Sequence, residues 1–158
     1  MSTSADPCEL DADGLSKLVH ERRISCRELM AAFLRRIELL NPRFNAIVSL
    51  RDPQALLAEA DALDAELAKG SSRGWLHGLP VAVKDLSDVA GIRTTMGSPI
   101  FRENVAAADG LMAARMRAAG AILIGKTNTP EFGLGSQTYN TVFGATRNAW
   151  DPDLCAGG

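Results

Sequence analysis

The sequence is poor in the residues that build metal centres and disulfide frameworks. It has only three cysteines, Cys8, Cys26 and Cys155, and only two histidines, His20 and His77. The cysteines are odd in number and far apart, and none of these residues has the paired spacing of a zinc site. Neither a disulfide scaffold nor a zinc centre is therefore expected.

The sequence also lacks a long apolar run and an excess of charge of one sign. No run approaches the ~18 apolar residues that span a bilayer, and the start has no basic and apolar leader. Lys and Arg (17) nearly balance Asp and Glu (19), so nucleic acid and membranes are not expected as partners. The composition predicts a soluble, cytoplasmic protein. Its 158 residues, 46% of them hydrophobic, suffice for one ordinary core.

Glycine is nearly absent from the first part of the chain. Only one of the 14 glycines, Gly14, precedes Gly70. Because glycine marks turns and interrupts helices, this distribution predicts a helical arm over residues 1–70. Residues 71–158 are then predicted to form a turn-rich α/β region, and no internal repeat is present.

Capping residues and apolar stripes predict three helices in the arm. The second is the best marked, because Ser25 and Glu28 have the spacing of a capping box. Its stripe is Leu29, Phe33, Ile37 and Leu40. The predicted helices begin after Asp11, Ser25 and Asp52 and end near Arg22, Asn41-Pro42 and Lys69-Gly70. A short extended connection is expected over residues 45–50.

In the second region, strand and helix patterns alternate as in an α/β layer fold. Strands are predicted over residues 80–84, 92–95 and 121–124. A helix capped by Asp109 is predicted between the last two, with Met112, Met116 and Ala119 facing inward. From Thr127 the pattern is loop-like apart from a short turn at Pro130, and the order of residues 133–158 is left open.

Lys84 stands out because it ends the apolar run Pro80-Val81-Ala82-Val83. Burial would disfavour the charged ammonium, and a neutral amine can act as a base. Alternatively, the aliphatic stem of Lys84 lies on apolar surface while its ammonium reaches water. The run alone leaves both interpretations open.

Residues 120–127, Gly-Ala-Ile-Leu-Ile-Gly-Lys-Thr, match the spacing of a phosphate-binding loop. Such a loop curls after a strand and opens a helix, whereas here the four intervening residues are themselves the predicted strand. Nucleotide binding is therefore not expected, and Lys126 is predicted to be structural.

Cys155 is a candidate thiol nucleophile beside Gly157 and Gly158. Nothing near it in the sequence would activate the thiol, and His77 lies far upstream. A catalytic cysteine is therefore not expected.

Several stretches together resemble the amidase signature family. They are Gly78-Leu79-Pro80-Val81-Ala82-Val83-Lys84-Asp85, Gly91 to Ser98, Gly125-Lys126-Thr127-Asn128, Glu131-Phe132-Gly133, and Thr138 to Asn148. Ser25 to Asn45-Ala46 also resembles the family, so the similarity covers nearly the whole chain.

The resemblance implies an α/β/α sandwich around a mixed sheet, of which this chain is the N-terminal part. It also implies hydrolysis of carboxamides by a Lys-Ser-Ser triad without a cofactor, with Lys84 as the triad lysine. In the family that lysine works through a serine preceded by a cis peptide bond. The expected partner is a small amide substrate, with a homodimer or partner subunits as further possibilities.

One departure from the family affects the expected activity. Family members carry a Gly-Gly-Ser-Ser-Gly-Gly stretch after a segment like residues 148–158, and this chain ends at Gly158. We therefore expect an N-terminal fragment, truncated before the serine-rich motif and inactive alone towards linear amides. Two alternatives are the glutamine-hydrolysing subunit of a tRNA-dependent amidotransferase and a non-catalytic binding module.

Overall fold

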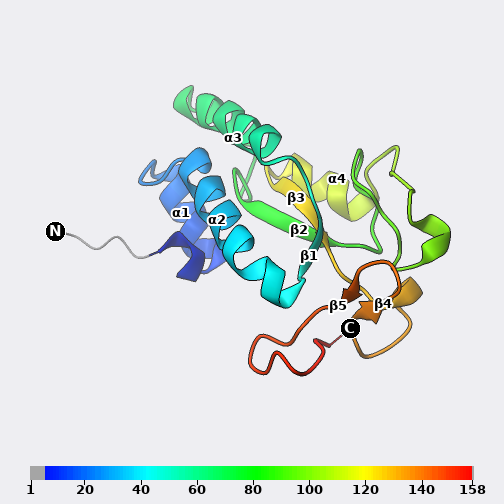
Figure 1. Cartoon of the computed structure of the whole chain (residues 1–158). Coiled ribbons are helices and arrows are strands. Elements are labelled where there is room, and N and C mark those ends of the chain that lie inside the picture. The colour runs from blue at the N-terminus through cyan, green and yellow to red at the C-terminus, as the bar shows by residue number, and fades with distance from the viewer. Residues whose placement is uncertain (1–5, 158) are drawn as a thin grey trace.

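Strand β3 is the centre of a small mixed sheet in the computed structural model, which describes residues 6–157. β3 (Ile122–Thr127) pairs in parallel with β2 (Pro80–Lys84) and antiparallel with β1 (Ile47–Leu50), giving the order β1-β3-β2 (Figure 1). A separate antiparallel pair is formed by β4 (Tyr139–Asn140) and β5 (Gly144–Ala145). The mixed sheet agrees with the predicted α/β class.

Within the described residues, four α-helices surround this sheet, and Figure 1 shows α1, α2 and α3 grouped apart from α4. The elements are α1 (Ala12–His20), α2 (Cys26–Phe44), α3 (Pro53–Ala68), α4 (Leu111–Ala118), and the 3₁₀ turns η1 (Pro7–Glu9), η2 (Pro99–Phe101) and η3 (Glu131–Gly133). Within residues 6–157, none of these helices has the length and apolar character needed to cross a bilayer.

Alternate residues of β3 face two separate cores. Ile122 and Ile124 pack with the apolar stripes of α1, α2 and α3. Leu123, which points the other way, packs with Val83 of β2 and Ala113 of α4. A strand buried on both faces is typical of a sheet covered by helices on both sides, so the layer order is helices, sheet, helix.

The predicted helix starts in the arm are confirmed. Asp11 accepts a hydrogen bond from the Gly14 amide, Asp52 from the Ala55 amide, and Ser25 forms the capping box with Glu28. Each side chain satisfies an amide that has no partner inside its helix. The predicted inward stripe of α3 is also confirmed, because Leu56, Ala60, Leu63 and Leu67 are buried.

The predicted end of α2 at Asn41-Pro42 is wrong, because the helix continues through Pro42 to Phe44. Proline removes only one helical hydrogen bond, and the end is secured in other ways. The Oδ1 atom of Asn41 accepts hydrogen bonds from the amides of Ala46 and Ile47, and Asn45 ends the helix in the left-handed conformation. These contacts also start β1 inside the segment predicted to be extended.

The predicted strand over residues 92–95 is absent; of this segment only Arg93 forms a bridge, with Val105. The segment bonds the backbone of residues 104–106 at a few positions only, with the Thr94 amide donating to the Asn104 carbonyl at 2.9 Å and the Ala106 amide donating to the Ile92 carbonyl at 3.3 Å. The next amide, that of Thr95, donates to the Asp85 carboxylate, so the pairing ends there. Conversely, the strand predicted over 121–124 extends to Thr127.

The start of α4 also differs from the prediction. Gly110, not Asp109, is its N-cap, and Ala113 rather than Met112 faces the core, since Met112 is 42% exposed. Asp109 instead accepts the Ala90 amide at 2.8 Å and pairs with Arg117 at 2.8 Å. The side chain of Asp109 therefore connects α4 to the turn after β2.

This pairing predicts a pH-dependent contribution to stability. The Arg117 guanidinium, by its hydrogen bond, lowers the pKa of Asp109 below its usual 3.8. The stabilisation is complete above the unfolded-state pKa and is lost as the pH falls through the lower folded-state pKa. We expect Asp109→Asn to lower the free energy of unfolding by about 1 kcal/mol at neutral pH. Urea unfolding of both proteins at pH 7 and in strong acid should show this difference shrinking; a constant difference would contradict the assignment.

Candidate active site at the ends of the parallel strands

Lys84 lies at the carboxyl end of β2, where its register partner in β3 is Thr127. Ligand sites of open α/β sheets commonly form at this edge of parallel strands. The chain turns away at once, with the Ser87 amide donating to the Lys84 carbonyl at 3.0 Å. The residue that the sequence singles out therefore lies at the edge where a site is expected.

The side chain of Lys84 is exposed, whereas Val83 beside it is buried. The sequence left open whether the ammonium of Lys84 is buried or reaches water, and its burial is not observed. β2 is an edge strand of the sheet and Lys84 is its last residue, so the side chain extends into solvent as in the alternative interpretation. A catalytic role for Lys84 stays a prediction.

Asp85, directly after Lys84, is fully buried and bonded to the loop at residues 95–97. Its carboxylate accepts the Thr95 amide at 3.0 Å, the Thr95 hydroxyl at 2.5 Å and the Gly97 amide at 3.4 Å. The Met96 amide in turn donates to the Asp85 carbonyl at 3.0 Å. This bonding fixes the backbone next to Lys84. The signal that sequence reasoning missed is an acidic residue immediately after a buried strand.

Lys126 is the lysine that the fold buries. It is fully buried, and its ammonium donates to the Ser87 carbonyl. Loss of hydration lowers the pKa of Lys126, an effect that the nearby carboxylates of Asp85 and Asp88 oppose. Because residues 122–127 form β3, the formal phosphate-loop match is a strand. The predicted structural role of Lys126 fits its contact with the turn after Lys84.

Asparagine side chains hold the loops after β3 in place. Asn140 is buried and donates to Asn128 Oδ1 at 2.7 Å and to the Thr129 carbonyl at 2.8 Å. Asn45, at the end of α2, donates to the Phe143 carbonyl at 2.8 Å. The Thr146 hydroxyl returns a bond to the Asn45 carbonyl at 2.6 Å. The segment after residue 133, whose order the sequence left open, is thus bonded to the helical arm.

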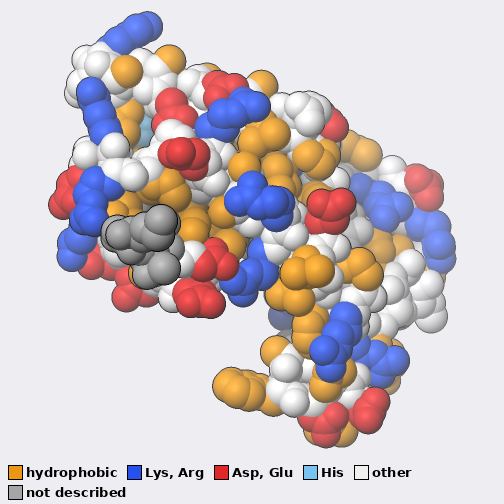
Figure 2. All heavy atoms as spheres, turned by 60° about the vertical axis from the view of Figure 1, so that its left-hand side comes forward, with side chains coloured by type: hydrophobic (Ala, Val, Ile, Leu, Met, Phe, Trp, Pro, Cys, Tyr) orange, Lys and Arg blue, Asp and Glu red, His pale blue; other side chains and the backbone are white. Residues whose placement is uncertain are grey.

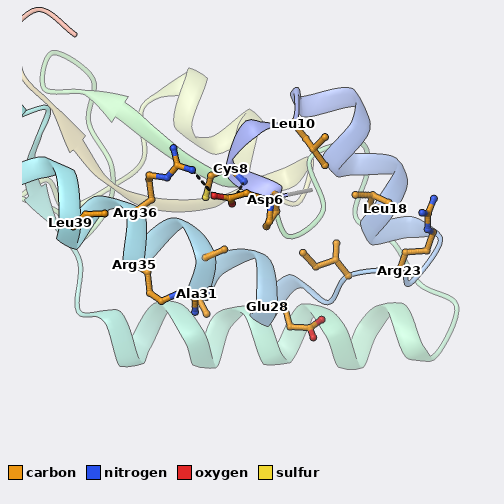
Figure 3. Close-up of a pocket in the computed structure, with 13 residues that line it drawn as sticks. Asp6, Cys8, Leu10, Leu18, Arg23, Glu28, Ala31, Arg35, Arg36 and Leu39 are labelled. Carbon is orange, nitrogen blue, oxygen red and sulfur yellow. Dashed lines mark hydrogen bonds and ion pairs between the residues drawn. The ribbon is translucent and has the colours of Figure 1, made fainter. Parts of the chain in front are cut away.

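Two open grooves lie away from Lys84, on either side of α2. The first, about 930 Å³, lies among η1, α1 and α2 and has Cys8, Leu10 and Arg36 in its lining (Figure 3). The second, about 790 Å³, lies between α2 and the start of α3 and includes Leu57 and Phe143. Neither lining includes Lys84, so the grooves are separate from the candidate site.

The cysteines show no sign of catalysis. Cys155 is half-buried and donates to the Thr138 carbonyl at 3.1 Å. Burial and the neighbouring Asp64 raise the pKa of Cys26 to about 12, so its thiol stays protonated. No cluster of three or more metal-ligating side chains occurs between residues 6 and 157.

Comparisons with known proteins agree with this arrangement. The family model described as Amidase matches residues 28–158, which is most of the chain, and this chain therefore belongs to the amidase signature family. A glutamyl-tRNA(Gln) amidotransferase subunit of Bdellovibrio bacteriovorus is 40% identical over 144 residues, which are 91% of this chain and 29% of that protein.

Solved structures give the same result. A bacterial aryl acylamidase of the amidase signature family superposes with a TM-score of 0.88 and 31% identity, over 94% of this chain and 31% of that one. A 6-aminohexanoate cyclic dimer hydrolase complexed with substrate gives a TM-score of 0.82 and 32% identity, over 94% and 30%. The chain thus spans about a third of the length of the relatives that it matches.

Proposed function

We propose that Lys84 is the base of an amide-hydrolysing site formed at the carboxyl ends of β2 and β3. One observation carries the proposal: the family motif that ends in Lys84 and Asp85 stands at this edge, with Asp85 bonding the adjacent loop. A lysine acts on a hydroxyl nucleophile only within hydrogen-bond reach and in its neutral form. In this proposal, covering of Lys84 by further protein would supply the desolvation that residues 6–157 do not give it.

We further propose that a pair of serines supplies the proton relay and the nucleophile. The 158 residues contain no Gly-Gly-Ser-Ser stretch, so these serines belong to sequence outside the chain. Ser98 is buried and its hydroxyl lies near the Ile100 amide, at 3.4 Å, a position that does not suit attack on a substrate. We infer that the 158-residue chain alone does not hydrolyse amides.

For the substrate we propose a linear aliphatic or aryl amide. The similar proteins differ in what their names describe, an aryl acylamidase, a cyclic dimer hydrolase and part of an amidotransferase, and an amide bond is the chemistry that suits all three. A second candidate is glutamine hydrolysis as one subunit of a tRNA-dependent amidotransferase, favoured by the 40% identity to the Bdellovibrio protein. Ammonia release stimulated by added partner subunits would distinguish it from an independent amidase.

The role of Lys84 predicts a large loss of activity on its removal. The experiment uses the protein made from its complete coding frame, after its intact mass has been measured. In that protein, Lys84→Ala should lower kcat/KM for a simple anilide about 10³-fold, which is the range for loss of a general base. Lys69→Ala, at another exposed lysine, is the matched control and should keep full activity. The 158-residue chain should show no turnover. Turnover by that short chain that Lys84→Ala abolishes, or an active complete Lys84→Ala protein, would contradict the proposal.

A further inference from the structure

A serine and a histidine outside the candidate active site form a hydrogen-bonded pair at the surface. The Ser72 hydroxyl lies 2.9 Å from Nε2 of His20, although the two residues are 52 positions apart in the sequence. His20 is the last residue of α1, and Ser72 lies in the loop that precedes β2, whereas Lys84 ends that strand. Both residues of the pair are exposed, so a small molecule can reach them.

The hydrogen bonds of His20 determine which of its ring nitrogens can take up a proton. Nδ1 lies 2.8 Å from the Ser16 carbonyl, and because a carbonyl only accepts, Nδ1 carries the hydrogen of the neutral ring. Nε2 then has a free lone pair, which faces the Ser72 hydroxyl. A base that a third group holds in one tautomer, within hydrogen-bond reach of a hydroxyl, is the arrangement that activates a serine nucleophile. Here the third group is a backbone carbonyl.

The loop is fixed on both sides of Ser72. The Ser71 amide donates to the Glu66 carbonyl at 3.1 Å. The Arg73 amide donates to Nδ1 of His77 at 3.1 Å, and His77 is fully buried. The Arg73 side chain also donates to the Glu66 carboxylate at 2.8 Å. These bonds hold the serine next to the histidine before any substrate is bound.

The polar atoms of Ser72 suit a nucleophile. Its hydroxyl oxygen accepts a hydrogen bond from the Gly74 amide at 3.2 Å. Its hydroxyl hydrogen has two acceptors in reach, and Nε2 of His20 at 2.9 Å is closer than the Gly74 carbonyl at 3.3 Å. In the described part of the chain, the amide of Ser72 donates to no backbone carbonyl. An N–H group beside the nucleophile is the kind of donor that stabilises the oxyanion of acyl transfer.

An aromatic side chain in the same loop favours an aryl substrate. Trp75 follows Ser72 by three residues and is 53% exposed. Its carbonyl accepts the Ser16 hydroxyl at 2.6 Å, so the loop is joined to the residue that orients His20. Figure 2, which brings the helical side forward, shows further apolar side chains exposed between charged ones on this face. Aromatic rings pack favourably against one another, which suits a small aryl group.

We propose that Ser72 and His20 form a second acyl-transfer site, which reacts with small aryl esters. Ser72 Oγ attacks the ester carbonyl carbon and forms a new C–O bond, while its proton passes to Nε2 of His20. The bond from that carbon to the aryloxy oxygen breaks, and the leaving phenolate takes up the proton. Water then attacks the acyl-serine and gives a proton to Nε2 of His20. The bond to Oγ breaks, Oγ regains its proton from His20, and the carboxylic acid leaves.

An ester suits this open site better than an amide does. A phenolate leaves without prior protonation, whereas the nitrogen of an amide must gain a proton as it leaves. Ester reactivity at Ser72 is therefore compatible with a 158-residue chain that does not hydrolyse amides, and it does not depend on the proposed role of Lys84.

Acylation of the 158-residue chain by para-nitrophenyl acetate tests the proposal. Peptide mass spectrometry should find an acetyl group on Ser72 that forms about 100-fold faster than on Ser71, the neighbouring exposed serine. Nitrophenolate release should show a burst followed by slower turnover. His20→Gln keeps an acceptor for the hydroxyl but removes the base, and should slow acylation of Ser72 about 100-fold.

Ser71→Ala is the matched control and should leave the burst unchanged, whereas Ser72→Ala should abolish it. Circular dichroism should show that all variants are folded. An unchanged burst in Ser72→Ala would mean that another group reacts with the ester directly, and would overturn the proposal. Equal rates of acylation at Ser71 and Ser72, or full acylation of Ser72 in the His20→Gln protein, would also overturn it.

Discussion

Asp85→Ala is expected to lower the free energy of unfolding by about 3 kcal/mol or more. The substitution leaves the Thr95 amide and the Thr95 hydroxyl without their acceptor in a fully buried place, whereas the Gly97 amide keeps its bond to the Thr95 hydroxyl oxygen at 3.0 Å. Each unsatisfied buried donor costs about 1–3 kcal/mol. Asp85→Asn should recover little of the loss, because the amide nitrogen places a donor where donors already converge.

Urea unfolding measures this loss, and Asp88→Asn is its control. Asp88 lies three residues further on with an exposed side chain, so its substitution should change stability by less than about 0.5 kcal/mol. Hydrogen exchange should also be faster in Asp85→Ala at the amides of residues 95–97, if the variant folds. Equal stability of the Asp85→Ala and Asp88→Asn proteins would show that the bonds to the loop contribute nothing.

Gly78→Ala is expected to have an effect of similar size for a different reason. A Cβ atom at this position would lie 2.2 Å from Cys26 Sγ and 2.9 Å from Cys26 Cβ, and Gly78 also has a φ of +77°. Cys26 is fully buried at the start of α2, so the helix would have to move. Backbone strain and overpacking together should lower the free energy of unfolding by about 3 kcal/mol.

Gly91 provides a matched control for this clash. Its φ is +75°, almost the same as at Gly78, but a Cβ atom there would meet nothing within 4 Å. Gly91→Ala should therefore lower the free energy of unfolding by the backbone strain alone, about 1 kcal/mol. The difference in this loss between the two variants measures the clash with Cys26. Adding Cys26→Ala should recover part of the loss at Gly78. Equal losses in the two glycine variants would rule out a close contact between Gly78 and Cys26.

The arm was predictable because its signals are local. The caps Asp11, Ser25 and Asp52 each act on the amide three residues away, and such short-range chemistry is visible in the sequence. The end of α2 was missed because the local bonds of Asn41 are joined by contacts of Asn45 with residues 143–146, which lie about 100 residues further along the chain. A proline rule that considers only neighbours predicts an earlier end.

The candidate site could be predicted only in outline. The motif around Lys84 locates a residue on the correct edge of the sheet, but its exposure depends on which strand is the edge, which the sequence does not state. Likewise, the segment over residues 92–95 has the composition of a strand, yet Thr95 bonds to a side chain, that of Asp85. In both places a tertiary contact decides against the local pattern.

The central position of β3 also determines the order in which the chain can fold during synthesis. β1 and β2 pair only with β3 in this sheet, so no ladder can close before residues 122–127 have left the ribosome. The helical arm emerges earlier and can pack α2 against α3 through local contacts. The nascent chain therefore carries two unpaired strands from the completion of β2 until β3 has been made, and joining such distant segments is slow. Such strands are a substrate for chaperones that bind extended apolar segments.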